Sequence, residues 1–266
     1  MLTNYHTHST YCDGKNTLEE MVDAAITQGF NALGFSGHGY TPFDTRYCMK
    51  DTEGYIAAVN QLKNRYAQQL QIYLGVEEDA FAPVKRNCFD YIIGSSHYAF
   101  KDGCYYPIDS GHAYFQKCLE VFNHNPLALA ESYYENFIAY IRRRKPGIIG
   151  HFDLITKFDE LDTSLFLNDP AYQNLAQKYA DLAADAQCLF EVNTGAIARG
   201  YRSSPYPSEN LLYFLKKRGA KLVLSADSHR TDTLQTHFPE TRAYLRDIGF
   251  SCVYALYNGE FVPDIL

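Results

Sequence analysis

Two histidines stand two residues apart near the start of the chain, in the segment Tyr5-His6-Thr7-His8-Ser9. Successive side chains of an extended strand point to opposite faces, so His6 and His8 are expected to point the same way. Two imidazoles on one face can bind a divalent cation, and Asp13 follows closely as a further oxygen ligand. A polar strand end that faces solvent would have the same pattern, so the pair gains meaning only from the rest of the chain.

Histidines and carboxylates recur where later apolar segments end. In a parallel α/β barrel the carboxyl ends of all strands converge on one face, where active sites are built. Imidazole and carboxylate together suit zinc, iron or manganese, and the candidates are numerous enough for two or three ions that share a bridging carboxylate. These candidate metal ligands are His6, His8, Asp13, His38, Glu77, His97, His151, Asp227 and His229.

Short apolar segments alternate with helical stretches over the whole length, which predicts parallel βαβ units. The sequence Thr17-Leu18-Glu19-Glu20 predicts a capping box that opens a helix ending at Gly29. Seven or eight strands without a break favour a single-domain (β/α) barrel over residues 1–266, rather than an open doubly wound sheet. Further helices are expected after Asp51, over about 111–123, 127–144 and 170–186, after Ser208, and before the strand Cys252–Tyr257.

Charge and composition limit the classes of partner. A formal charge of −7 and a pI near 5.7 argue against nucleic acid or anionic membrane as partners. No apolar run approaches the roughly 20 residues of a membrane span, and a polar segment stands where a signal peptide would be apolar. The seven cysteines form no C-x-x-C pair, which favours reduced thiols in the cytoplasm. No obligate protein partner is expected, and the basic run Arg142–Lys145 suits the C-terminal end of a helix.

The candidate ligands stand in short motifs that span residues 6 to 229. These motifs are His6-x-His8, Asp13-Gly14, Gly37-His38, Gly75-Val76-Glu77, Ser96-His97, Gly150-His151 and Ser225-Ala226-Asp227-Ser228-His229. In combination they resemble the polymerase and histidinol phosphatase (PHP) family. Within it the chain looks most like the histidinol-phosphatases of histidine biosynthesis, because of the segment Thr10–Gly14 and the stretch from Asn193 to Pro207.

The resemblance implies a distorted seven-stranded, TIM-like (β/α)7 barrel that holds three divalent metal ions, zinc first, with iron or manganese as alternatives. One ion would be held by His6, His8, Glu77 and Asp227. The second would be bridged by Glu77 and held with His97 and His151, and the third by Asp13, His38 and His229. Several relatives have histidine where this chain has Asp13, which leaves the occupancy of the third site open. The neighbouring Glu78 is the alternative to Glu77, but it falls on the opposite face of the strand.

The resemblance also implies an activity, the hydrolysis of a phosphate monoester, with L-histidinol phosphate as the small-molecule substrate and L-histidinol and phosphate as products. Metal ions would lower the pKa of a bridging water, and the hydroxide would attack phosphorus in line. Asp13 or His229 would protonate the leaving alkoxide.

Substrate contacts are expected from residues just past the predicted strand ends. Arg199 is the candidate phosphate clamp and also a catalytic candidate, because a guanidinium binds phosphate as a fork. Arg230 is a second phosphate-binding candidate, and Tyr40 and Tyr201 are candidates for the organic half of the substrate.

Three alternatives remain at this stage. The same metal set supports phosphodiester cleavage, as in exonuclease modules, or hydrolysis of another small phosphate ester; the acidic charge counts against a long nucleic-acid substrate. A metal-dependent amidohydrolase would usually have a lysine at a strand end, and the sequence has none there. A metal-loaded module that only binds phosphorylated ligands is the non-enzyme alternative.

Overall fold

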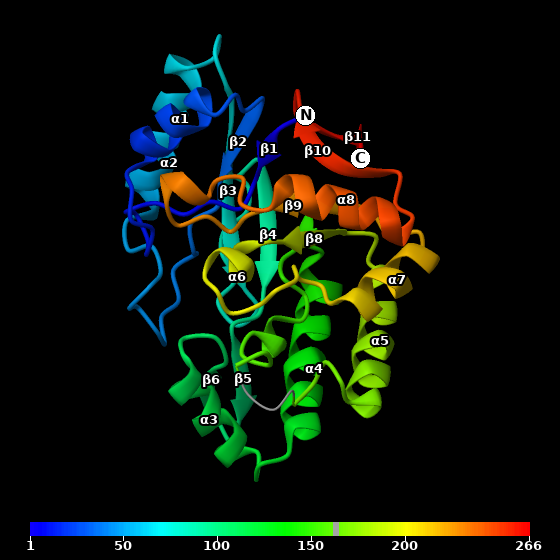
Figure 1. Ribbon diagram of the computed structural model, residues 1–266. Helices are drawn as coiled ribbons and strands as arrows, with labels where there is room; N and C mark the ends of the chain where they lie inside the picture. The colour runs from blue at the N-terminus through cyan, green and yellow to red at the C-terminus, as the bar shows by residue number, and fades with distance from the viewer. Residues whose placement is uncertain (162–164) are drawn as a thin grey trace.

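A computed structural model describes residues 1–161 and 165–266. Seven parallel strands form one curved sheet in the order β1-β2-β3-β4-β7-β8-β9 (Figure 1). Every hydrogen-bonded pair within this sheet is parallel, as the alternation of strands and helices predicts. The strands are β1 (Thr3–Asn4), β2 (Ala32–Phe35), β3 (Gln71–Asp79), β4 (Tyr91–Ser95), β7 (Ile148–Ile149), β8 (Leu189–Asn193) and β9 (Leu222–Ser225).

The two edges of this sheet meet just beyond β1, which nearly closes the barrel. Thr7 and Ser228 form a parallel bridge. The His8 N–H donates to the Ser228 carbonyl at 2.8 Å, and the Ser228 N–H donates to the His6 carbonyl at 3.0 Å. The regular part of β1 is thus shorter than predicted, yet these bonds hold the histidine segment in line with the sheet. The predicted TIM-like barrel of seven strands is confirmed.

Helices cover the outside of the barrel between most strands. The predicted capping box is present, because the Glu20 N–H donates to the Thr17 hydroxyl and the Thr17 N–H donates to the Glu20 carboxylate. None of the described helices has the length and apolar character needed to cross a membrane. The helices are α1 (Leu18–Thr27), α2 (Thr52–Arg65), α3 (His112–Val121), α4 (Pro126–Arg144), α5 (Pro170–Ala184), α6 (Gly195–Ala198), α7 (Glu209–Lys217) and α8 (Phe238–Ile248).

The barrel departs from strict β/α alternation in two places. Residues 80–90, between β3 and β4, contain no helix. After β4 the chain forms an antiparallel hairpin of β5 (Tyr98–Lys101) and β6 (Cys104–Pro107) before it enters α3. Figure 1 shows this hairpin and α3 at the end of the barrel where the arrow of β4 points, so the excursion borders the mouth. The sequence of this hairpin has no periodic pattern that would predict it.

The last predicted strand is not part of the barrel. Residues Cys252–Tyr257 form β10, which pairs antiparallel with β11 (Glu260–Ile265). This second hairpin lies at the opposite end of the barrel, beside both chain termini (Figure 1). The Tyr5 hydroxyl donates to the Leu256 carbonyl of β10 at 2.7 Å, so the hairpin covers the barrel floor.

Tyrosines fill the floor half of the barrel interior. Tyr5, Tyr73 and Tyr91 are buried together, and the Tyr5 ring meets the other two edge to face at about 6 Å between centroids. Gly34 and Gly75 make room for Tyr91, because a Cβ at either glycine would lie under 2.5 Å from an atom of that side chain. Polar residues are therefore confined to the other half of the barrel, towards the mouth.

The alternation along β3 separates two neighbouring carboxylates. Glu77 points into the barrel, whereas the fully buried Glu78 points outward to Arg144 at 2.7 Å and Arg86 at 2.5 Å. Tyr140 donates to the same carboxylate at 2.8 Å. Burial raises the pKa of Glu78, but the hydrogen bonds from Arg144 and Arg86 outweigh burial and lower it to about 2. Arg144 therefore ties the end of α4 to the barrel and does not simply face solvent as one of several helix-end cations.

Replacing the buried carboxylate in Glu78→Gln should lower the free energy of unfolding at pH 7 by about 3 kcal/mol, because two guanidinium groups lose their partner. The folded-state pKa lies below the unfolded value, so the wild-type advantage is complete above about pH 4.3 and shrinks as the pH falls towards 2. Urea unfolding with a chelator present, at pH 7 and at pH 3, measures this gap without a contribution from metal binding.

Glu19→Gln is the matched control for that experiment. Glu19 also pairs with an arginine, Arg65, but both side chains are about half exposed or more. Its loss should leave stability almost unchanged at either pH. Equal losses in the two variants would contradict the role given to Glu78.

Candidate metal centre

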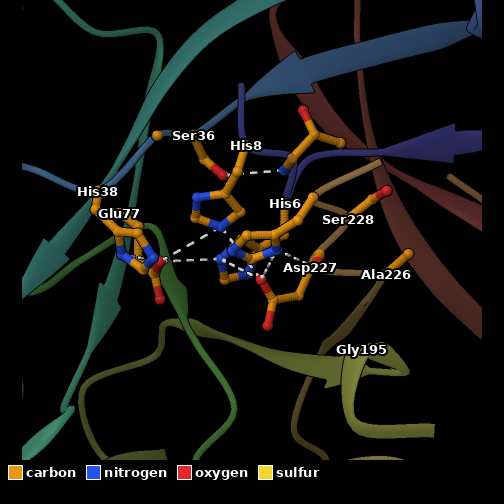
Figure 2. A network of polar contacts seen from close by, with 12 residues as sticks. His6, His8, Ser36, His38, Glu77, Gly195, Ala226, Asp227 and Ser228 are labelled. Carbon is orange, nitrogen blue, oxygen red and sulfur yellow. Dashed lines mark hydrogen bonds and ion pairs between the residues drawn. The ribbon is translucent and has the colours of Figure 1, made fainter. Parts of the chain in front are cut away.

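Glu77 lies at the centre of a cluster of imidazole rings at the mouth end of the barrel (Figure 2). Its side chain has no exposed surface, and both oxygens face histidine nitrogens. These nitrogens are His38 Nδ1 at 2.8 Å, His151 Nε2 at 3.0 Å, His6 Nε2 at 3.2 Å, His97 Nε2 at 3.3 Å and His8 Nε2 at 3.7 Å. The rings come from the ends of four different strands, as the convergence of parallel strand ends predicts.

Asp227, two residues after β9, supplies a second carboxylate on the same side. Its Oδ1 lies 3.2 Å from His8 Nε2 and 3.6 Å from His6 Nε2. The residue has a left-handed backbone with φ 48°, a conformation that is costly for a side chain larger than glycine. That backbone turns the carboxylate into the barrel, where Figure 2 shows it opposite Glu77 and beside both histidines.

Asp13 supplies a third carboxylate from the loop after the histidine segment. Its Oδ1 lies 3.3 Å from His229 Nε2, 3.7 Å from His38 Nε2 and 3.9 Å from His8 Nδ1. Gly14 makes this loop possible, because a Cβ there would lie 2.5 Å from the Ser9 main chain. The structure thus brings all nine candidate ligands together.

The chemistry of this cluster fits divalent cations. Several of its buried polar atoms have no hydrogen-bond partner even though oppositely charged groups lie close by, which is unusual in a protein interior. Lone pairs that converge on one point, rather than donor–acceptor pairs, explain this pattern. The atoms are His6 Nε2, His8 Nε2, Asp13 Oδ1 and Glu77 Oε2.

The donor atoms fall into groups small enough to surround an ion. In each group the ligand atoms lie within 4.8 Å of one another, and several residues belong to two groups. Among the shared residues, the Glu77 carboxylate has two oxygens and can bridge neighbouring ions, whereas an imidazole nitrogen has one lone pair and serves one ion. The groups are His6, His8 and Asp227; His6, Glu77 and His151; His38, Glu77 and His97; and His8, Asp13, His38 and His229.

The electrostatics of the cluster keep its ligands in the forms that bind cations. Burial raises the pKa of Glu77, but His6, His38 and His97 lower it well below its ordinary value. Burial and the neighbouring His229 and His38 lower the pKa of His8 to about 3, so this ring is neutral at pH 7. Ionised carboxylates and a neutral imidazole are the states that coordinate a metal ion.

The pKa of His6 is shifted in the opposite direction from that of His8. Burial lowers its pKa, but the carboxylates of Glu191, Glu77 and Asp227 outweigh burial and raise it well above the ordinary value. The cluster therefore attracts positive charge at the position of His6, and a cation there would compete with the proton.

Sequence reasoning missed two carboxylates that orient candidate ligands. Glu191 Oε1 lies 2.6 Å from the ring Nδ1 of His6. The other oxygen, Oε2, accepts from the main-chain N–H of His151 at 2.8 Å. Asp79 Oδ2 lies 3.1 Å from both the ring Nδ1 and the main-chain nitrogen of His97. Such partners fix which ring nitrogen remains free for a metal. Two signals were available, since Asp79 shares strand parity with Glu77 and Glu191 is an acid inside an apolar strand.

Of the four candidate substrate residues, Arg199 contacts the cluster. Its Nη2 donates to Asp227 Oδ2 at 2.9 Å, and its Nη1 donates to the Asp227 carbonyl at 3.2 Å. Gly195 permits this approach, because a Cβ there would lie 2.9 Å from Arg199 Nη2. The guanidinium also acts on Asp227 itself: burial raises the pKa of that carboxyl, and Arg199 is the largest of the influences that lower it.

The other three substrate candidates lie apart from the candidate ligands in the interactions of the described residues. Arg230 is exposed and pairs with Asp232 at 2.6 Å. Tyr40 is 49% exposed and lines a shallow depression beside Lys50 and Thr52. Tyr201 packs against Phe158 and beneath the ammonium of Lys157.

Comparison with known proteins agrees with this geometry. The PHP domain profile matches residues 4–195 of the chain. A Schizosaccharomyces pombe protein named "Probable histidinol-phosphatase" is 30% identical, over 97% of this chain and 90% of its own length. The histidinol-phosphatase of Bacillus subtilis is 24% identical, over 85% of this chain and 92% of its own.

A solved structure shares the fold. The histidinol phosphate phosphatase of Lactococcus lactis, complexed with zinc, L-histidinol and phosphate, superposes with a TM-score of 0.73 and covers 98% of each chain at 19% identity. The arrangement of strand-end ligands, the domain match and the full-length relatives together show that this chain belongs to the PHP domain family.

Proposed function

We propose that this protein is a metal-dependent phosphate monoester hydrolase that converts L-histidinol phosphate to L-histidinol and phosphate. One observation carries the proposal: five imidazole nitrogens and one buried carboxylate, Glu77, converge at the mouth of a barrel. The histidinol-phosphatase relatives, which match along almost the whole chain, support the choice of substrate.

Divalent metal ions belong to this activity, and we propose three of them, with zinc as the first choice. His6, His8, Glu77 and Asp227 would hold one ion, and Glu77, His97 and His151 the next. Asp13, His38 and His229 would hold the third. The preference for zinc rests on the imidazole-rich donor set and on the zinc in the Lactococcus lactis structure.

The ions, when bound, would supply an activated water at neutral pH and neutralise charge on the phosphoryl oxygens. The chain's own contribution is position and charge. Arg199 is held on Asp227 through two donors and has further N–H groups for a phosphoryl oxygen. His229, which lies 3.5 Å from Arg199 Nη1 and 3.3 Å from Asp13, is at the open side, where a leaving alkoxide would need a proton.

The cellular setting fits a small-molecule substrate. All seven cysteines are free, which supports a reducing compartment, and we propose the cytoplasm. The net charge of −7 leaves the positive charge that attracts an anionic substrate to the metal ions and to local groups such as Arg199.

Purified, metal-loaded protein should release phosphate from L-histidinol phosphate far faster than from sugar phosphates or bis(p-nitrophenyl) phosphate. Asp227→Asn should lower kcat/KM by at least about a thousandfold, because it removes a ligand charge and the anchor of Arg199. A chelator should abolish turnover, and added zinc should restore it.

Each alternative predicts a different result in the same assay. Cleavage of the diester alone would keep the metal centre and overturn the substrate. Metal-loaded protein that binds phosphate but hydrolyses no ester of the panel would identify a binding module and contradict the proposal.

Glu191→Gln should weaken metal binding by about ten- to a hundredfold, because the His6 ring loses the carboxylate that orients it and the main-chain N–H of His151 loses a charged acceptor. Competition with a chromophoric chelator measures the affinity directly. Glu240→Gln, which changes an exposed carboxylate on α8, is the matched control and should bind metal as the wild type does. Equal affinities in Glu191→Gln and wild type would refute the role of Glu191.

A further inference from the structure

A carboxylate that the mechanism does not use lies beside the metal cluster. The β5–β6 hairpin carries the chain away from the barrel mouth and back again, and the Ile108 N–H donates to the His97 carbonyl at 3.0 Å. Asp109 is the next residue. The hairpin therefore delivers Asp109 to the rim formed by the candidate ligand His97.

The segment after β7 meets Asp109 from the other side. Lys157 follows a short 3₁₀ turn (Leu154–Thr156). Its ammonium donates a hydrogen bond to the Asp109 main-chain carbonyl at 2.8 Å. The same ammonium lies 3.6 Å from Asp109 Oδ2 and 5.1 Å from the Tyr201 ring centroid. Lys157 is buried. The Asp109 backbone is therefore held from two sides, by the bond of Ile108 to His97 after β4 and by Lys157 after β7.

The Asp109 carboxylate is only partly engaged. Its Oδ2 forms an ion pair with Lys157 at 3.6 Å, and among the described residues no group donates a hydrogen bond of 3.5 Å or less to either oxygen. The side chain keeps 24% of its surface exposed although it borders a buried cluster. Part of this carboxylate is therefore accessible at the mouth, where a ligand can complete its hydrogen bonds.

Asp109 lies close to the metal cluster, because the residue before it, Ile108, is bonded to the main chain of His97. Burial raises the pKa of Asp109, but Lys157 and then His97, His151 and His38 lower it, so the group is ionised at pH 7. Burial lowers the pKa of Arg199, the proposed phosphate-binding residue, but Asp227 and, more weakly, Asp109 raise it. Phosphate-binding groups and an anionic group thus lie on one site, which suits a substrate with negative charge at one end and positive charge at the other.

We propose that Asp109 is a specificity-determining residue that binds the cationic nitrogen of the substrate's alcohol half, while the phosphate lies on the metal cluster and Arg199. The substrate class is the phosphate monoester of an amino alcohol. This inference rests on the proposed function and explains how the site would distinguish L-histidinol phosphate from uncharged or anionic phosphate esters. Lys157 is a positioning residue that holds Asp109.

The test compares two esters of equal length, ethanolamine phosphate and propyl phosphate, which differ by an ammonium in place of a methyl group. Wild-type holoenzyme should prefer ethanolamine phosphate in kcat/KM by about tenfold or more, and Asp109→Asn should remove that preference. The same variant should weaken the binding of L-histidinol, measured by calorimetry on metal-loaded protein, by about tenfold or more.

Asp44→Asn is the matched control. Asp44 is another carboxylate near the start of β5, where it accepts from the Tyr98 hydroxyl at 3.1 Å, but Arg46 already pairs with it at 2.6 Å. This variant should retain the wild-type preference. If Asp109 were only a strut for Lys157, Asp109→Asn would lower kcat/KM for both esters by the same factor and leave the preference intact, which would overturn the inference.

Failure of the substrate assignment gives a different pattern. A wild type that ignores L-histidinol phosphate but prefers ethanolamine phosphate through Asp109 would refute the proposed substrate and keep the inference. A wild type with no preference between the two short esters, or with L-histidinol binding that Asp109→Asn leaves unchanged, would overturn the inference whatever the fate of the proposed function.

Discussion

Burial of the Glu77 carboxylate is the constraint on which the rest of the structure depends. An ion without solvent must be matched by positive charge at contact distance, and here five imidazoles surround it. Further negative charge comes from Asp227, Glu191 and Asp79. Arg199, whose guanidinium is permanently charged, pairs directly with Asp227. Neutral imidazoles carry no charge, so they balance the carboxylates only when they are protonated or when they coordinate metal cations together with them. The excess of negative charge is therefore what gives the barrel mouth its affinity for divalent metal ions.

The barrel makes that concentration of charge affordable by separating it from the apolar interior. Parallel strands deliver their last residues to one rim, so the ligands can come from distant parts of the sequence while each strand stays short. Below the rim the tyrosine layer is packed around Gly34 and Gly75 and keeps the charged ligands apart from the floor. The same alternation sends Glu78 outward to Arg86 and Arg144, where it fastens α4. Of two neighbouring acids on β3, Glu77 thus belongs to the metal cluster and Glu78 stabilises the packing of α4.

The ligand cluster could be predicted because two periodic rules produce it. Strand alternation put His6 and His8 on one face, and parallel topology brought the strand ends together; both hold in the structure. The β5–β6 hairpin, and with it Asp109, follows neither rule, since it depends on long-range contacts with Lys157 and His97. Arg230 and Tyr40 lie near strand ends in the sequence, but a loop's direction is set by its own contacts, such as the pairing of Arg230 with Asp232. Orientation in loops is thus what the sequence left open.

The sealed floor has a consequence for the order of events. Tyr5, Tyr73 and Tyr91 fill the far half of the barrel, and β10 lies beneath them, so in the described part of the chain the mouth is the open end of the barrel. With the proposed function, a phosphate ester would enter with its phosphate leading, and after hydrolysis the alcohol would stand between the inorganic phosphate and solvent. The alcohol would then leave first and the phosphate last. Such an order of release is an ordered uni-bi scheme, in which free phosphate competes with the incoming ester and the alcohol inhibits noncompetitively.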